Sequence, residues 1–174
     1  MFVQTHIHDS VQGVIAYLTQ NPDQALSQDK EAVAVIESGL RARATGPDGQ
    51  SLVCDMPTAL GGEGSAPSPG WMMRAALANC EAIMISLRAA QIGIELTALE
   101  VRVDSLSDDR GMLGMDDSIP AGPLNMKVTI RLGAAGVPIE KLHAIAAWAE
   151  AHSPVGEPLT RLMPVEYALE IVKG

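Results

Sequence analysis

The longest apolar segment of the chain predicts a helix near its centre. From Pro69 to about Ile92, small and aliphatic residues occur on every side of the predicted helix, and Gly93 follows as a stop signal. A helix that is apolar all round is typical of a buried position, so we expect it to form the core. Its charged residues break the apolar run, so it is not expected to span a bilayer: Arg74, Glu81 and Arg88.

Alternating polar and apolar residues predict strands on both sides of this helix. A run over 31–45 is followed by the turn sequence Gly46-Pro47-Asp48-Gly49, and residues 50–56 are expected to pair back as a second strand. Three further segments alternate in the same way, and Pro138 opens a second amphipathic helix that ends near His152. The three strand segments are 95–106, 124–132 and 165–172. This order predicts an α+β fold with antiparallel hairpins.

The first 30 residues differ from the rest of the chain. Asp9 and Ser10 are candidate N-caps for a short helix over 11–19, and Asn21-Pro22 is expected to end it. The following residues, up to Lys30, are polar. We therefore divide the chain into an N-terminal helical appendage, residues 1–30, and one domain, residues 31–174.

Composition restricts the class of protein. The 174 residues are 47% hydrophobic but only 3% aromatic, with nine Met, so the core must be built from small and flexible side chains. Such a core gains from burial against a second copy, and we expect an oligomer. The net charge of −9 opposes binding to nucleic acid or to an anionic membrane. With no secretory signal and only two cysteines, the cytoplasm is the expected location.

Cys80, in the middle of the apolar helix, is the main candidate for chemistry. A cysteine there is either packing or a reactive thiol, and residue type alone favours packing. Cys80 lies about three turns into the helix, so any activation must come from another element. Cys54 fits one face of a strand, and a Cys54–Cys80 disulfide stays open because its geometry depends on the fold.

Other candidate sites are weaker. His6 and His8 form an H-x-H pair without a third ligand, so we expect no metal site. His152 lies just past a predicted helix end, where an imidazole would cap the helix. The Gly61-Gly62-Glu63-Gly64 loop precedes a helix but lacks the lysine of a phosphate-binding loop, and we expect no cofactor. Its glycines are expected to let the chain cross close over a neighbouring segment.

Two segments together resemble the OsmC/Ohr family of osmotically inducible and organic hydroperoxide resistance proteins. They are GGEGSAPSPGWMMRAALANC, residues 61–80, and Ser153-Pro154-Val155 at the end of the second helix. The likeness covers about 32–172 and is closest in style to the less characterised branch with GGEG and a following Ser-Pro. It implies an OsmC-like fold, with antiparallel sheets wrapped around two long central helices in an intertwined homodimer.

The resemblance also implies a chemistry. In active members a first cysteine attacks the peroxide and becomes a sulfenic acid, and a second cysteine then forms a disulfide with it. Cys80 matches the first cysteine, whereas Ser153 stands where the second is expected. The position of the family's glutamate falls on Gly70, and no arginine occurs where the family has one. Four arginines remain as unplaced substitutes: Arg41, Arg43, Arg74 and Arg161.

Two functions follow as hypotheses. The first is an atypical one-cysteine peroxidase with peroxiredoxin-like activity, which reduces organic hydroperoxides through Cys80 and an external thiol reductant. The alternative is a catalytically silent OsmC-like protein that binds a small apolar or lipid-like ligand at the dimer groove, near Gly70 and Ser153 and lined by methionines such as Met72 and Met73. A hydrolase built on Ser153 and the adjacent His152 lacks an acid partner.

Overall fold

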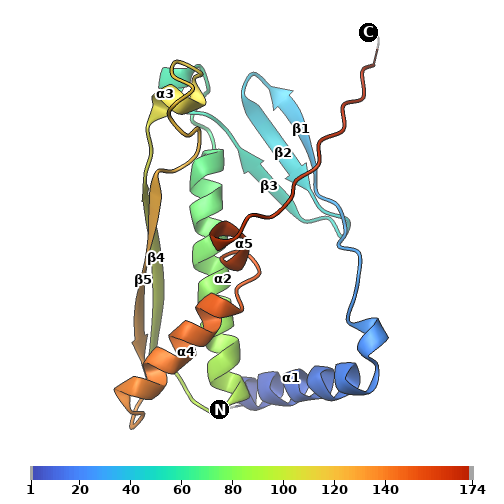
Figure 1. Ribbon diagram of the computed structural model, residues 1–174, viewed down its shortest axis with the longest axis vertical. Helices are drawn as coiled ribbons and strands as arrows, with labels where there is room; N and C mark the ends of the chain where they lie inside the picture. Colours follow the sequence, from blue (N-terminus) through green and yellow to red (C-terminus); the bar gives the residue numbers. More distant parts are fainter. Residues whose placement is uncertain (1, 173–174) are drawn as a thin grey trace.

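A single long helix forms the axis of the molecule. The protein was analysed as a computed structural model, which describes residues 2–172. Helix α2 (Pro69–Gln91) starts where predicted, with Pro69 in its first turn and the Ser68 hydroxyl accepting a 3.3 Å hydrogen bond from the Trp71 amide. The other elements are arranged around it (Figure 1).

One side of α2 is covered by a hairpin and a second helix. Strands β4 (Ala98–Leu106) and β5 (Asn125–Gly133) pair antiparallel, and α4 (Ile139–Ala151) packs against α2, as Figure 1 shows. The loop between the two strands contains the short helix α3 (Asp109–Met112). The buried core lies where α2 and α4 meet this hairpin. It consists of Ile85, Ala89, Ile94, Ile145 and Ala149.

The segment 31–45 is two strands, not the single predicted strand. Strand β1 (Val33–Ser38) turns back at Gly39, whose φ of +52° favours glycine, and β2 (Arg41–Thr45) pairs antiparallel with it. Strand β3 (Ser51–Cys54) follows the predicted 46–49 turn and completes the order β1-β2-β3. A 3-10 turn, η2 (Thr58–Leu60), begins the loop to α2. This sheet stands apart from the β4-β5 hairpin (Figure 1) and has exposed apolar side chains: Val33, Val35, Ile36 and Leu52.

The N-terminal helix is longer than the sequence indicates. Helix α1 (Phe2–Gln20) runs through the predicted caps Asp9 and Ser10 and packs across the C-terminal end of α2 (Figure 1). There the His8 Nδ1 atom lies 3.2 Å from the Ala90 carbonyl oxygen and 3.0 Å from that of Gln91. Through this contact the early turns of α1 pack against the end of α2. Capping rules consider only local sequence, so they could not predict the longer helix. A 3-10 turn, η1 (Pro22–Gln24), follows.

The C-terminal segment does not form the predicted strand. After helix α5 (Glu157–Thr160), residues 161–172 are extended, and within the described chain the stretch 165–172 pairs with no strand. Its apolar residues are largely exposed, including Tyr167 at 94% and Leu169 at 86%. Over residues 2–172, no helix combines the length and the apolar character that crossing a membrane requires.

Candidate functional site

The structure brings Cys80 and Ser153 together although 73 residues separate them. Cys80 is half-buried in the middle of α2, and Ser153 is fully buried just beyond the end of α4. The Ser153 hydroxyl donates a hydrogen bond to the Cys80 Sγ atom across 3.2 Å and accepts one of 2.9 Å from the Gly156 amide. The serine is therefore held with its hydroxyl hydrogen directed at the sulfur.

A tight turn after α4 fixes Ser153 in this position. The Ser153 carbonyl accepts a 2.9 Å hydrogen bond from the Glu157 amide, where α5 begins. A Cβ atom on Gly156 would lie 2.8 Å from the Glu81 Oε1 atom and 2.9 Å from the Ser153 Oγ atom. A larger residue at this position would require the Glu81 and Ser153 side chains to shift. No local sequence pattern identifies Gly156, because the close approach of this turn to α2 is a property of the fold.

The glycine loop before α2 is organised by a buried carboxylate. Asp55, only 1% exposed, accepts hydrogen bonds from the amides of Met56, Glu63 and Ser65 and from the Ser65 hydroxyl. The bond from the Ser65 amide is the main reason that the pKa of Asp55 lies below its ordinary value of 3.8, although burial acts in the opposite direction. This loop leads directly into α2, so Asp55 helps to position the helix that carries Cys80.

Gly62 closes over Asp55 in the same loop. A Cβ atom there would lie 1.9 Å from the Met56 carbonyl oxygen and 2.9 Å from the Asp55 Oδ1 atom, so no other residue fits without a backbone shift. The prediction that these glycines allow a close crossing is confirmed at Gly62. Asp55 itself was missed, since it resembles an ordinary polar position at the end of a strand. The sequence signal that could have identified Asp55 is an acidic residue followed by a glycine-rich loop, whose backbone amides need hydrogen-bond acceptors.

The four candidate arginines have partners other than Cys80 in the part of the chain that the structure describes. Arg41 and Arg43 both form ion pairs with Glu37, at 3.0 and 2.5 Å. Arg41 also donates to the Ser65 hydroxyl across 2.6 Å. The remaining two bind Ser105 (from Arg74, 3.1 Å) and Glu157 (from Arg161, 2.5 Å).

The remaining predicted site residues lie elsewhere on the same helix or nearby. Gly70, Met72 and Met73 occupy the first turns of α2, where Gly70 and Met73 are exposed and Met72 is half-buried. Cys54 and Cys80 are both free thiols. A site formed by these methionines therefore stays a prediction.

His152 caps α4, as its position predicts. Its Nδ1 atom lies 2.7 Å from the Trp148 carbonyl oxygen, and its ring stacks on the Trp148 ring with centroids 4.2 Å apart. The Arg88 guanidinium lies 4.9 Å from the centre of the Trp148 ring. The histidine thus belongs to the contact between α2 and α4. His6 and His8 are part of α1, and in the described residues no group of three or more His, Cys, Asp or Glu side chains could hold a metal ion.

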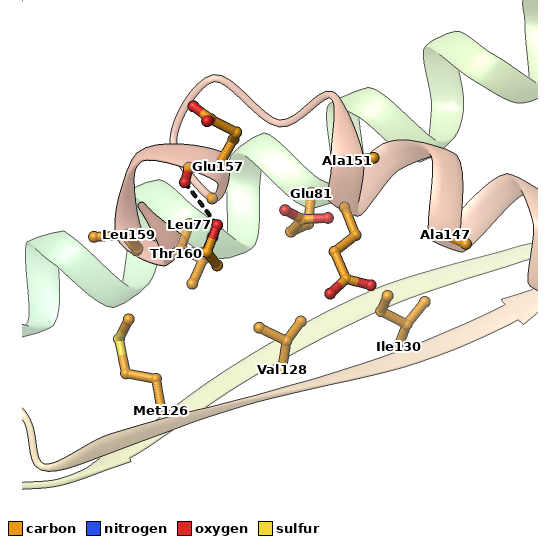
Figure 2. A pocket seen from close by; sticks show the side chains of 12 residues that line it. Leu77, Glu81, Met126, Val128, Ile130, Ala147, Ala151, Glu157, Leu159 and Thr160 are labelled. Carbon is orange, nitrogen blue, oxygen red and sulfur yellow. Dashed lines mark hydrogen bonds between the residues drawn. The ribbon is translucent and has the colours of Figure 1, made fainter. Parts of the chain in front are cut away.

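A groove of about 890 Å³ lies beside the Cys80–Ser153 pair, between α2, the α4–α5 turn and β5 (Figure 2). Its apolar lining comes from β5 and from α2, α4 and α5, and three carboxylates also contribute. The lining includes Leu77, Met126, Val128 and Ile130 together with Glu81, Glu150 and Glu157. Gly156 lines it as well, so one glycine contacts both the groove and the Ser153 hydroxyl.

With this geometry in place, comparisons with known proteins identify the family. The family model described as OsmC-like protein matches residues 62–168. The chain belongs to the OsmC-like family. The match includes Cys80, Ser153 and every residue that lines the groove. No curated protein matches the chain.

Solved structures agree with the OsmC-like fold. An OsmC-like protein from Mycoplasma pneumoniae superposes with a TM-score of 0.64 at 14% identity, covering 79% of this chain and 91% of the other. An organic hydroperoxide resistance protein OsmC from Legionella pneumophila gives 0.56 at 21% identity, with 77% and 90% covered. An organic hydroperoxide resistance protein from Elizabethkingia anophelis gives 0.56 at 18% identity, with 79% and 91% covered. The predicted α+β, OsmC-like fold is therefore confirmed.

Proposed function

We propose that this OsmC-like protein is a one-cysteine peroxidase, which reduces organic hydroperoxides through Cys80 with an external thiol as reductant. The observation that carries the proposal is the 3.2 Å hydrogen bond from the Ser153 hydroxyl to the Cys80 sulfur. The hydroxyl places a hydrogen-bond donor at the sulfur, and the thiolate, which is the nucleophilic form of cysteine, is a stronger acceptor than the thiol. Two of the structures with the same fold are named organic hydroperoxide resistance proteins, which supports the substrate class.

The first step transfers one oxygen atom to the sulfur. The Cys80 thiolate attacks one peroxide oxygen, an S–O bond forms and the O–O bond breaks. The alkoxide leaves, takes up a proton and becomes the alcohol. Sulfur is oxidised by two electrons to a sulfenic acid, and the peroxide bond is reduced by the same two electrons.

Return to the thiol requires an external reductant because Ser153 cannot form a disulfide. One external thiol attacks the sulfenic sulfur, which gives a mixed disulfide and water. A second external thiol then releases Cys80 and leaves as a small-molecule disulfide. Since this cycle consumes thiols, we place the protein in the cytoplasm, where thiols are kept reduced.

The proposal includes a homodimer. The β1-β2-β3 sheet and the segment 161–172 expose apolar side chains such as Ile36 (61%) and Ile171 (81%), and large exposed apolar surfaces mark interaction sites. A second copy would bury them.

Steady-state consumption of cumene hydroperoxide with dithiothreitol tests the proposal. The wild type should consume hydroperoxide faster than buffer alone, and Cys80→Ser should lower the rate to the buffer level. Cys54→Ser is the matched control and should keep the wild-type rate, because Cys54 lies on β3 as a separate free thiol. A wild-type rate equal to that of buffer would refute the peroxidase and favour the silent ligand-binding alternative.

A further inference from the structure

Glu81 is a largely buried residue whose carboxylate lines the groove without a partner among the described residues. Glu81 is 4% exposed, and in Figure 2 its side chain extends from α2 toward the space between Leu77 and Ala151. No hydrogen bond or ion pair to this carboxylate occurs within the described part of the chain. Among the described residues no buried side-chain oxygen lacks a hydrogen-bond partner, so the unpaired Glu81 oxygens open on the groove. A carboxylate in this largely apolar setting is a site for a cation.

The rest of the groove is suited to an amphiphile. Met126, Val128 and Ile130 from β5 form an apolar wall opposite Glu81 (Figure 2). Glu150 and Glu157 also line the groove, but the Arg161 guanidinium forms a 2.5 Å ion pair with Glu157. Within the described residues, the carboxylates of Glu81 and Glu150 therefore stay uncompensated beside an apolar surface.

We propose that this groove binds an organic ammonium ion that carries an alkyl chain. The ammonium group would pair with Glu81, and the alkyl chain would lie on the β5 wall. The net charge of −9 attracts cations to the molecule and disfavours fatty acid anions. The inference does not depend on whether Cys80 reduces peroxides, because neither Cys80 nor Ser153 lines the groove.

The size of the groove favours a small molecule over a side chain of a second copy. Its volume, about 890 Å³, falls in the range of about 300–1,000 Å³ that is common for small-molecule sites. A single lysine or arginine side chain would fill only part of it. A small molecule and a side chain of a second copy can be distinguished by experiment. Only if a second copy occupied the groove would a substitution of Glu81 change the oligomeric state.

Isothermal titration calorimetry with three ligands of equal chain length tests the proposal. Octylamine, octan-1-ol and octanoate share the apolar chain and differ in the charge of the head group. Octylamine, charged at pH 7, should bind the wild type about tenfold more tightly than octan-1-ol, and octanoate should bind most weakly. Glu81→Gln should reduce octylamine affinity about tenfold and leave octan-1-ol binding unchanged.

Two further variants complete the design. Glu95→Gln removes the same charge from the exposed loop between α2 and β4 and should bind octylamine as the wild type does. Ala151→Lys places an ammonium group at the exposed edge of the groove and should abolish octylamine binding, even if Glu81→Gln does not fold. Equal affinity for the three ligands would overturn the proposal. So would an absence of octylamine binding to the wild type. If Glu81→Gln also dissociated a dimer, Glu81 would belong to a subunit contact.

Discussion

Ser153→Cys places a second thiol at the position of the residue that donates a hydrogen bond to Cys80. The Ser153 Oγ and Cys80 Sγ atoms lie 3.2 Å apart, and the introduced sulfur would start from a similar position. A disulfide bond measures about 2.05 Å, so the two sulfurs need to approach by roughly 1.1 Å. The longer C–S bond and a small side-chain rotation supply much of this shift. We therefore expect the variant to form a disulfide between Cys80 and the introduced cysteine when it reacts with hydroperoxide.

The expected stabilisation follows from the length of the closed loop. The bond would join positions 73 residues apart. In the chain-entropy model, a loop of this length loses enough freedom in the unfolded state to stabilise the fold by about 4 kcal/mol. The oxidised variant should therefore unfold at higher urea concentration than the same variant after reduction.

Mass spectrometry and urea unfolding give the two readouts, in a Cys54→Ser background that removes the other thiol. One equivalent of cumene hydroperoxide should remove two hydrogens from Ser153→Cys, whereas the parent with Ser153 should gain one oxygen atom. Ser118→Cys, in the exposed loop before β5, is the matched control and should form no intramolecular disulfide. If diamide, a general thiol oxidant, also fails to join positions 80 and 153, the described proximity is wrong. If diamide succeeds and hydroperoxide fails, the geometry holds and the peroxidase proposal is refuted.

Two further predictions concern the glycine loop. Gly62→Ala should lower the free energy of unfolding in urea by about 3 kcal/mol, because the new methyl group would overlap the Met56 carbonyl. Gly122→Ala is the control, because a Cβ atom there meets nothing within 4 Å. Equal stability of the two variants would contradict the close contact at Gly62. The lowered pKa of Asp55 means that its carboxylate stabilises the fold above its unfolded value of 3.8 and that this stabilisation is lost as pH falls through the still lower folded value. Thermal melts should therefore show Asp55→Asn least stable relative to the wild type near pH 7, with the difference shrinking toward pH 3; a difference independent of pH would argue against an ionised Asp55.

The helices near the core could be predicted because their information is local. Pro69 in the first turn and Gly93 after the last define the bounds of α2. Only one side of the helix is buried against α4 and the β4-β5 hairpin, whereas Trp71 and Ile83 are 51% and 63% exposed. The prediction of a single strand over 31–45 is wrong. The apolar pattern continues through Gly39, where the chain turns back and a second strand begins. The segment 165–172 has a strand pattern, yet strand formation needs a partner edge that the pattern does not contain.

The candidate site could be predicted only in part, and from a family resemblance rather than from local patterns. The Cys80–Ser153 pair came from a resemblance, since nothing local relates a residue within one helix to a residue beyond the end of another. Glu81 and Gly156 were missed because their roles arise only where the turn after α4 meets α2. On the sequence, Glu81 is one of three charged residues in an apolar helix, and neither Arg74 nor Arg88 is buried as it is.

Trapping with dimedone, a reagent selective for sulfenic acids, tests the central claim most directly. The wild type would be mixed with one equivalent of cumene hydroperoxide and dimedone, digested, and analysed by mass spectrometry. The proposed function predicts one adduct per chain on the peptide that contains Cys80, and none on that of Cys54. No adduct on Cys80, or equal labelling of both cysteines, would contradict it.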